Sequence, residues 1–149
     1  MQDKAFLLKN ISSDIRALFH LLYLAGEQLH RVSPITIPQR AMLEALYNHG
    51  KQTIIQLAEN RSVSRQFIQK NIEYLKKNGY VEIMGNPEHR RSFFIEITPQ
   101  GKSTIMNMLN KEQELFTDLC GSFKESNLKN SLIVLGEFKK ILKEYLIEK

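Results

Sequence analysis

Residues 53–79 read TIIQLAENRSVSRQFIQKNIEYLKKNG, and they carry the signals of two helices in close succession. Thr53 and Gln56 have the spacing of a capping box, in which the threonine hydroxyl and the glutamine side chain each satisfy a free backbone N–H. We predict one helix over residues 54–60 and a second over residues 65–78. Two short helices joined by a tight connection are typical of a helix-turn-helix.

The connection between these helices is short and polar. It comprises Asn60, Arg61 and Ser62, while Ser64 is a suitable N-cap for the second helix and Gly79 a suitable end. The apolar spacing predicts that both helices pack on one core. The residues expected to face inward are Ile54, Leu57 and Ala58 on the first helix, and Val63, Phe67, Ile68, Ile72 and Leu75 on or just before the second.

The other face of the second helix is polar. Near its start it presents Arg65, Gln66, Gln69 and Lys70, with Glu73 further along. Arginine and glutamine can make paired hydrogen bonds with base edges, and the first turns of a recognition helix enter the major groove. The alternative is an ordinary solvated helix face, because exposed arginine, glutamine and lysine are common.

A β-hairpin is predicted directly after the helix-turn-helix. Residues 80–84 and 93–97 have the composition of strands, and residues 85–88 have turn chemistry. Arg90 and Arg91 fall near the tip. This is the layout of a winged helix, and arginines on an extended arm can enter the minor groove or pair with phosphates. The alternative is a surface hairpin whose charges only keep it soluble.

Long helices are predicted on both sides of this region. Residues 1–35 hold an amphipathic helix that ends before Pro34, and Thr98-Pro99 begins a helix that runs to about Cys120. A final helix carries a near-heptad apolar seam. Such a seam needs a partner, and a second copy of the chain is favoured over a distant part of a small fold. The seam consists of Leu128, Leu132, Leu135, Phe138, Leu142 and Tyr145.

These elements predict a mainly α protein with a small β-hairpin wing, a winged helix-turn-helix with flanking dimerisation helices. We divide it into an N-terminal dimerisation helix (1–35), a DNA-binding winged domain (36–101) and C-terminal dimerisation helices (102–149). The net charge of the chain is +5. The middle segment has nine basic and six acidic residues, net +3, and each flank has net +1. An anionic partner is therefore expected in the middle.

Composition excludes several classes of protein. The chain has 149 residues of which 42% are hydrophobic, which is too apolar for a disordered chain. Its longest uncharged apolar stretch, residues 17–26, is shorter than the ~20 residues of a membrane span. Cys120 is the only cysteine, so no internal disulfide can form and a cytoplasmic location is expected. No phosphate loop, nucleophile elbow or metal-ligand spacing is present, which predicts no enzyme, no metal and no cofactor.

Four motifs, in this order and spacing, resemble those of the MarR-type winged-helix regulators. They read LAENRSVSR at 57–65, IEYLKKNGYV at 72–81, NPEHRR at 86–91 and ITPQG at 97–101. The flanking helices match the layout of that family, so the resemblance covers the whole chain. It implies a homodimer whose terminal helices interdigitate, and whose two winged domains bind successive major grooves of a pseudo-palindromic operator.

The resemblance also implies which residues meet the DNA and that a small aromatic or lipophilic effector controls binding. It carries Ser64, Arg65, Gln66, Gln69 and Lys70 over as recognition-helix residues and Arg90 as the wing-tip arginine. With the N-cap Thr53 and with Arg91, these are the predicted DNA-contacting residues.

The sequence departs from the family pattern at three positions. Asn86 and His89 stand where the wing usually has two aspartates. The second aspartate often orients the neighbouring arginine, so the orientation of the wing is left open here. A histidine at this position would make the charge of the wing depend on pH. Ser62 stands where the turn often has glycine, so this turn must accept a side chain. A sensing role for His89 or for Cys120 is left open, and the favoured alternative for Cys120 is a small buried apolar residue.

The sequence thus predicts a sequence-specific, double-stranded DNA-binding transcriptional regulator, most simply a repressor. The alternative is a winged helix used as a protein-interaction module without specific DNA binding. The modest net +3 of the middle segment, diluted by Glu73, Glu88 and Glu96, is compatible with either.

Overall fold

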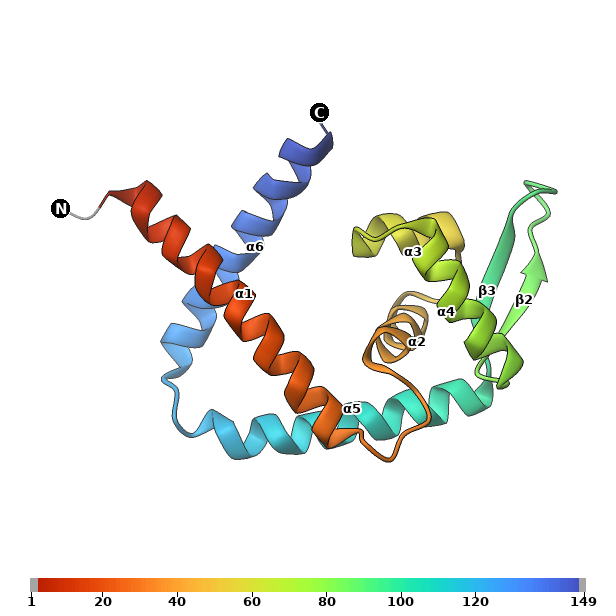
Figure 1. Ribbon diagram of the computed structural model, residues 1–149, viewed down its shortest axis with the longest axis horizontal. Coiled ribbons are helices and arrows are strands. Elements are labelled where there is room, and N and C mark those ends of the chain that lie inside the picture. Colours follow the sequence, from red (N-terminus) through yellow and green to blue (C-terminus); the bar gives the residue numbers. More distant parts are fainter. Residues whose placement is uncertain (1–2, 148–149) are drawn as a thin grey trace. The chain divides into compact units, whose positions relative to one another are not determined.

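The computed structural model describes residues 3–147 and confirms the predicted fold class. Helices dominate, and a small sheet holds the three strands found in the described residues. The elements follow one another along the chain in Figure 1. They are α1 (Lys4–Leu29), α2 (Ile37–His49), β1 (Gln52–Thr53), α3 (Ile54–Arg61), α4 (Arg65–Lys77), β2 (Val81–Gly85), β3 (Phe93–Ile97), α5 (Pro99–Cys120) and α6 (Glu125–Ile147).

The chain forms two compact units, Met1–Lys111 and Glu112–Lys149. The first unit holds α1 to β3 and the first half of α5. The second holds the end of α5 and all of α6. The helix-turn-helix and the hairpin therefore belong to one unit with a core of its own.

The helix starts obey the local capping signals. The hydroxyls of Thr36 and Thr53 each accept a hydrogen bond from the backbone N–H three residues later. In both capping boxes the glutamine side chain accepts a second bond from the backbone N–H of the threonine. In the second box the N–H of Gln56 donates to the Thr53 hydroxyl at 3.2 Å, and the N–H of Thr53 donates to Oε1 of Gln56 at 2.9 Å. Each box satisfies two backbone donors that a helix start leaves free, which fixes the start of α2 and explains why α3 begins where it was predicted to begin.

The turn between α3 and α4 is made by a non-glycine residue in the left-handed region. Ser62 has φ 53° and ψ 43°, and its backbone N–H reaches back to Glu59 at 3.2 Å. The N–H of Val63 closes the same turn by donating to the carbonyl of Ala58 at 3.1 Å. The expectation that this turn accepts a side chain is met, at the steric cost that a Cβ carries in this conformation.

Replacing Ser62 with glycine tests that cost. Relief of the left-handed strain outweighs the extra entropy of a glycine in the unfolded chain, so we expect Ser62→Gly to raise the free energy of unfolding by about 0.5 kcal/mol. Urea denaturation at one protein concentration measures the change. Ser62→Ala is the matched control, because it keeps the Cβ, and it should give no gain. An equal rise in the free energy of unfolding for both variants would show that loss of the serine hydroxyl, and not relief of the backbone strain, causes the gain.

The small sheet joins the hairpin to the start of α3. Its strand order is β1-β3-β2, with both pairs antiparallel. In β2 and β3, Val81 lies opposite Ile97 and Gly85 opposite Phe93. In β1, Thr53 lies opposite Phe94. The two-residue strand β1 was not predicted, because it is too short for any periodic pattern and exists only through its partner strand.

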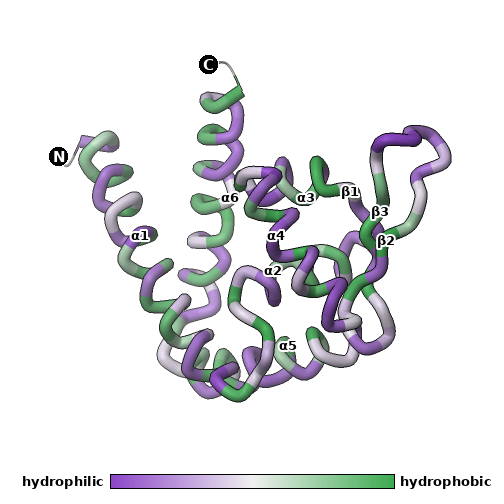
Figure 2. Tube along the Cα trace, turned by 45° about the vertical axis from the view of Figure 1, so that its right-hand side comes forward, coloured by the Kyte–Doolittle hydropathy of each residue, from purple (hydrophilic) through white to green (hydrophobic). Residues whose placement is uncertain are grey.

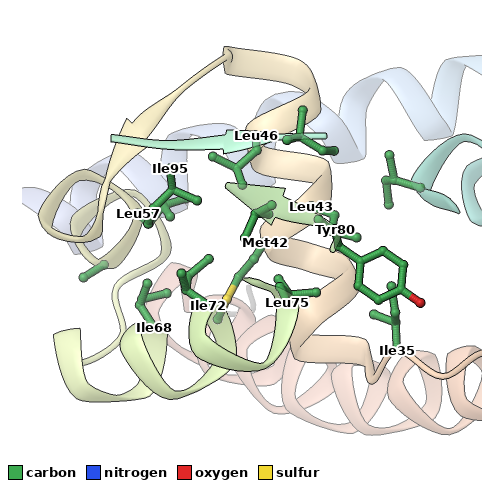
Figure 3. Close-up of a cluster of buried hydrophobic side chains, with 14 residues drawn as sticks. Ile35, Met42, Leu43, Leu46, Leu57, Ile68, Ile72, Leu75, Tyr80 and Ile95 are labelled. Carbon is green, nitrogen blue, oxygen red and sulfur yellow. The ribbon is translucent and has the colours of Figure 1, made fainter. Parts of the chain in front are cut away.

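The core of the first unit is formed by α2, α3, α4 and the sheet. Figure 3 shows its side chains converging between these elements. As predicted, Leu57 and Ala58 of α3 and Ile68, Ile72 and Leu75 of α4 are buried, while Ile54 is half-buried. They pack with Met42, Leu43 and Leu46 of α2, with Val81, Ile95 and Ile97 of the sheet, and with Ile105 of α5.

Two residues expected to face inward do not. Val63 is 37% exposed and Phe67 is 41% exposed, so this part of the prediction is wrong. Burial of Ile68, Ile72 and Leu75, at spacings of four and three, fixes the inner face of α4. Phe67 precedes Ile68 by one residue, and one residue rotates a side chain by about 100° around a helix. Phe67 therefore lies on the flank of α4 and not on its inner face.

The long helices α1 and α6 bury no residue within the single chain. Apolar residues recur along both helices, and the hydropathy colouring of Figure 2 shows them as green bands among purple ones. Leu18, Leu22 and Leu132 are among the large apolar residues that stay exposed. Isolated exposed leucines are ordinary, whereas runs of them along whole helices are typical of surfaces that pack against another helix or another molecule.

Candidate nucleic-acid interface

The candidate interface begins at the N-terminus of α4. The hydroxyl of Ser64 accepts a hydrogen bond from the N–H of Phe67 at 3.1 Å, which caps the helix. A hydroxyl that accepts in this way keeps its own proton to donate, for instance to a phosphate oxygen. The capped end also carries the positive end of the helix dipole. Ser64 is exposed, so both features face solvent.

The outer face of α4 carries the predicted polar set. Arg65, Gln66, Gln69 and Lys70 are all exposed, as predicted. Within residues 3–147, Arg65, Gln66 and Lys70 make no side-chain hydrogen bond or ion pair, so their donors are available to a ligand. Gln69 differs, because its Nε2 donates to Oε1 of Glu73 at 3.3 Å. The face thus combines two cations, two amides and one carboxylate.

Thr53 lies at the start of α3 and beside the sheet. It is half-buried, and its hydroxyl oxygen is engaged in the capping box while its backbone pairs with β3. The free hydroxyl proton remains for a phosphate. Beside it, the ammonium of Lys51 lies over the ring of Phe94, 5.0 Å from the centroid, in a cation–π contact.

The wing keeps its turn despite the missing aspartates. The side-chain oxygen of Asn86 accepts a hydrogen bond from the N–H of Glu88 at 3.0 Å, and its carbonyl accepts one from the N–H of His89 at 3.3 Å. An asparagine oxygen accepts these bonds as an aspartate would, so Asn86 supports the turn without adding a negative charge. Arg90 and Arg91 follow, both exposed, at the strongly hydrophilic tip seen in Figure 2.

The recognition helix and the wing are held to one core. The backbone N–H of Tyr80 donates to the carbonyl of Leu75 at 2.9 Å, which ties the start of the hairpin to the last turn of α4. Ile95 of β3 packs in the same buried cluster as Ile68 and Ile72 of α4. The cationic tip and the polar helix face therefore extend from one packed core, and Figure 1 shows α4, β2 and β3 as neighbours.

A polar cleft of about 700 Å³ lies elsewhere in this unit, between α2 and α3. Its floor includes the buried Gln52, whose amide donates to the carbonyl of Ala45 at 3.2 Å and accepts from Asn60 at 3.0 Å. Lys51 and Arg61 line its rim. A lining of amides and charges does not match the aromatic or lipophilic effector that the family resemblance implies.

Residues 3–147 present neither a metal-ligand cluster nor a membrane-spanning helix. No group of three or more histidine, cysteine, aspartate or glutamate side chains gathers there as a metal site would require. Within the same residues, none of the helices is sufficiently long and apolar to span a bilayer. Cys120 is exposed at the end of α5 and carries a free thiol. The sequence argument for a small buried cysteine at this position is therefore wrong.

Comparison with known proteins finds a family model that matches part of this chain. Residues 33–92, which include the helix-turn-helix and most of the hairpin, match the model of the MarR family. The chain is also 27% identical, over 119 residues, to YsmB of Bacillus subtilis (strain 168), an uncharacterised HTH-type transcriptional regulator. That match covers 80% of this chain and 82% of YsmB.

Solved structures agree on the fold. The MarR family transcription regulator SP03579 superposes with a TM-score of 0.83 at 24% identity, over 98% of this chain and 97% of that one. BpsR of Bordetella bronchiseptica, whose DNA binding is regulated by 6-hydroxynicotinic acid, superposes with a TM-score of 0.76 at 17% identity. That match covers 87% of this chain and 92% of BpsR.

Proposed function

We propose that this chain is a MarR-type winged helix-turn-helix protein, as its match to that family's model over residues 33–92 indicates, and that it is a sequence-specific, double-stranded DNA-binding transcriptional regulator. One observation carries the proposal. On the exposed face of α4, the side chains of Arg65, Gln66 and Lys70 have hydrogen-bond donors that make no bond within residues 3–147. Exposed arginines also lie at the tip of the wing, which is built on the same core. Base edges and phosphates accept hydrogen bonds from side-chain donors of this kind when a packed core holds them in place.

The two parts of this surface have different tasks in the proposal. The polar face of α4 enters the major groove, where Gln66 and Gln69 read base edges and Arg65 and Lys70 contact bases or phosphates. Ser64 and Thr53 donate their hydroxyl protons to the flanking backbone. Arg90 and Arg91 reach the adjacent minor groove or its phosphates. Together these residues are the proposed DNA-contacting set.

The proposed active form is a homodimer. The exposed apolar runs of α1 and α6 bury nothing within one chain, and a second copy covers them when the helices of two chains interdigitate. Two recognition helices then face successive major grooves, which sets the half-sites of a pseudo-palindrome about one helical turn apart. Bound at a promoter, such a dimer excludes polymerase and acts as a repressor.

A small-molecule effector completes the proposal. The DNA binding of BpsR responds to 6-hydroxynicotinic acid, and a Staphylococcus aureus MarR structure holds salicylate. Both molecules are small aromatic acids. We propose that a small aromatic or lipophilic molecule relieves repression here as well. Melting-temperature shifts with salicylate as the probe, at constant ionic strength, test for such binding.

Removing the wing arginine should weaken DNA binding without changing sequence preference. We expect Arg90→Ala to lower affinity roughly tenfold on every duplex, because a charge-assisted contact is lost, and to reduce the slope of log affinity against log salt by about one per contact. Gln66→Ala should instead relax base preference by about 1–3 kcal/mol at one position. Fluorescence anisotropy on the upstream region and on random duplex measures both effects.

Lys111→Ala, which removes one exposed cation of α5, is the matched control and should leave affinity nearly unchanged. Equal affinity of the unmodified protein for its own upstream region and for random duplex would contradict specific regulation. Absence of binding to any duplex at low salt would favour the alternative, a winged helix that serves as a protein-interaction module.

A further inference from the structure

One carboxylate lies on the face of α4 that otherwise carries amides and cations. Glu73 is exposed, and it follows Gln66, Gln69 and Lys70 at spacings of seven, four and three residues. These spacings bring side chains to the same side of a helix. A carboxylate that approaches a polyanion is repelled by the phosphates, so its presence on this face calls for a compensating contact.

Glu73 does not pair with the cations around it. Lys77 stands four residues later, which is the favourable order for a Glu–Lys pair on a helix. Within residues 3–147 Glu73 nevertheless forms no ion pair. Its Oε1 accepts the hydrogen bond from Nε2 of Gln69 at 3.3 Å. The two side chains therefore act as one hydrogen-bonding unit.

The hydrogen-bonded pair of Gln69 and Glu73 has a defined set of remaining donors and acceptors. Gln69 keeps its Oε1 as an acceptor and its second N–H as a donor, while Glu73 keeps Oε2 as an acceptor only. In the major groove, adenine offers a donor at N6 and an acceptor at N7, which match the acceptor and donor left on Gln69. Cytosine offers the N4 amine, a donor that matches the free oxygen of Glu73.

We propose that Glu73 is a specificity-determining residue that accepts a hydrogen bond from the N4 amine of a cytosine, while its bond to Gln69 aligns that amide for a neighbouring base. The proposal rests on the proposed function, since it requires α4 to lie in the major groove. Four residues of helix span about 6 Å, which is less than two base-pair steps. The cytosine therefore lies within two base pairs of the base that Gln69 contacts.

This role predicts opposite effects on specific and non-specific binding. Where no cytosine amine meets Glu73, its carboxylate opposes the phosphates and lowers affinity. Glu73→Gln removes that repulsion, so affinity for random duplex should rise. The same change removes an acceptor-only group, so the preference for cytosine should fall from about tenfold to about twofold or less. A merely solvated carboxylate would raise both affinities by the same factor.

Selection from randomised duplexes, followed by anisotropy titrations on the selected site and its single-base variants, tests the proposal. Glu82→Gln is the control, because it makes the same charge change at an exposed position of the β2 strand and not on the polar face of α4. The expected result is a selected site with a cytosine whose preference falls in Glu73→Gln and persists in Glu82→Gln.

Two results would overturn the proposal while leaving the proposed function intact. One is a selected site with no preferred cytosine within two base pairs of the position that relaxes in Gln69→Ala. The other is an equal rise of specific and non-specific affinity in Glu73→Gln. If the unmodified protein selects no site at all, the proposed function itself fails, so the two failures are distinguishable.

Discussion

Gly101→Ala should destabilise the winged domain by about 3 kcal/mol or more, the upper range for overpacking a tight contact. Gly101 is buried in the first turn of α5. A Cβ added there would lie 2.2 Å from the carbonyl oxygen of Tyr80 and 2.8 Å from Cγ1 of Ile97. The first of these neighbours is backbone, which cannot move aside as a flexible side chain can.

The hydrogen bonds around Gly101 enlarge this effect. The carbonyl of Tyr80 accepts a bond from the N–H of Thr98 at 3.1 Å. The Thr98 hydroxyl donates to the carbonyl of Gly79 at 2.6 Å and accepts from the N–H of Gly101 at 3.1 Å. Moving α5 away from Tyr80 strains all three bonds, which fasten α5 to the end of α4 and the start of β2.

Thermal and urea unfolding at one protein concentration measure the loss. Gly85→Ala is the matched control, because an added Cβ there meets nothing within 4 Å, and its effect should stay within about 0.5 kcal/mol. Equal melting temperatures for the two variants would contradict the close approach of α5 to Tyr80.

Leu135→Glu should convert the proposed dimer to a folded monomer and lower the affinity for its proposed operator by about 100-fold or more. Leu135 is 43% exposed in the single chain and belongs to the predicted seam of α6. A carboxylate placed in an apolar interface loses its hydration without gaining a partner, which costs several kcal/mol in each of the two subunits. The core of the first unit is untouched, so each monomer keeps its winged domain. It loses the gain in affinity from binding two half-sites at once.

Light scattering after size exclusion measures the mass against 17.4 kDa for one chain, and anisotropy measures operator affinity. Asn130→Glu adds the same charge to an exposed position of α6 about 140° around the helix from Leu135. It should remain dimeric. A mass of one chain for the unmodified protein at micromolar concentration would contradict the dimer, and dimeric Leu135→Glu would show that the seam lies outside the interface.

The ends of the helices could be predicted from sequence because each depends on residues close along the chain. A capping box joins Thr53 to Gln56, and the start of α5 follows from Thr98-Pro99. The strand pair around the wing follows equally from local turn residues. The same local chemistry predicted the winged helix-turn-helix, and the fold agrees with that prediction.

The choice of DNA-contacting residues stays a prediction of a different kind. The structure agrees that Arg65, Gln66 and Lys70 are exposed, as expected for residues that contact a ligand. Which bases they contact depends on the DNA sequence, and the binding measurements with single-base variants decide it.

Sequence alone therefore determined the order of the helices and of the two wing strands, their approximate boundaries and the polar face of α4. The tertiary structure decided what depends on residues distant in sequence. It placed Gln52 opposite Ile95 to make β1, turned Phe67 to the flank of α4, and brought Gly101 against Tyr80. The physical reason is common to all three. Capping and turn formation are settled within about four residues, whereas strand pairing, the inner face of a helix and backbone contact are set by whichever segment packs alongside.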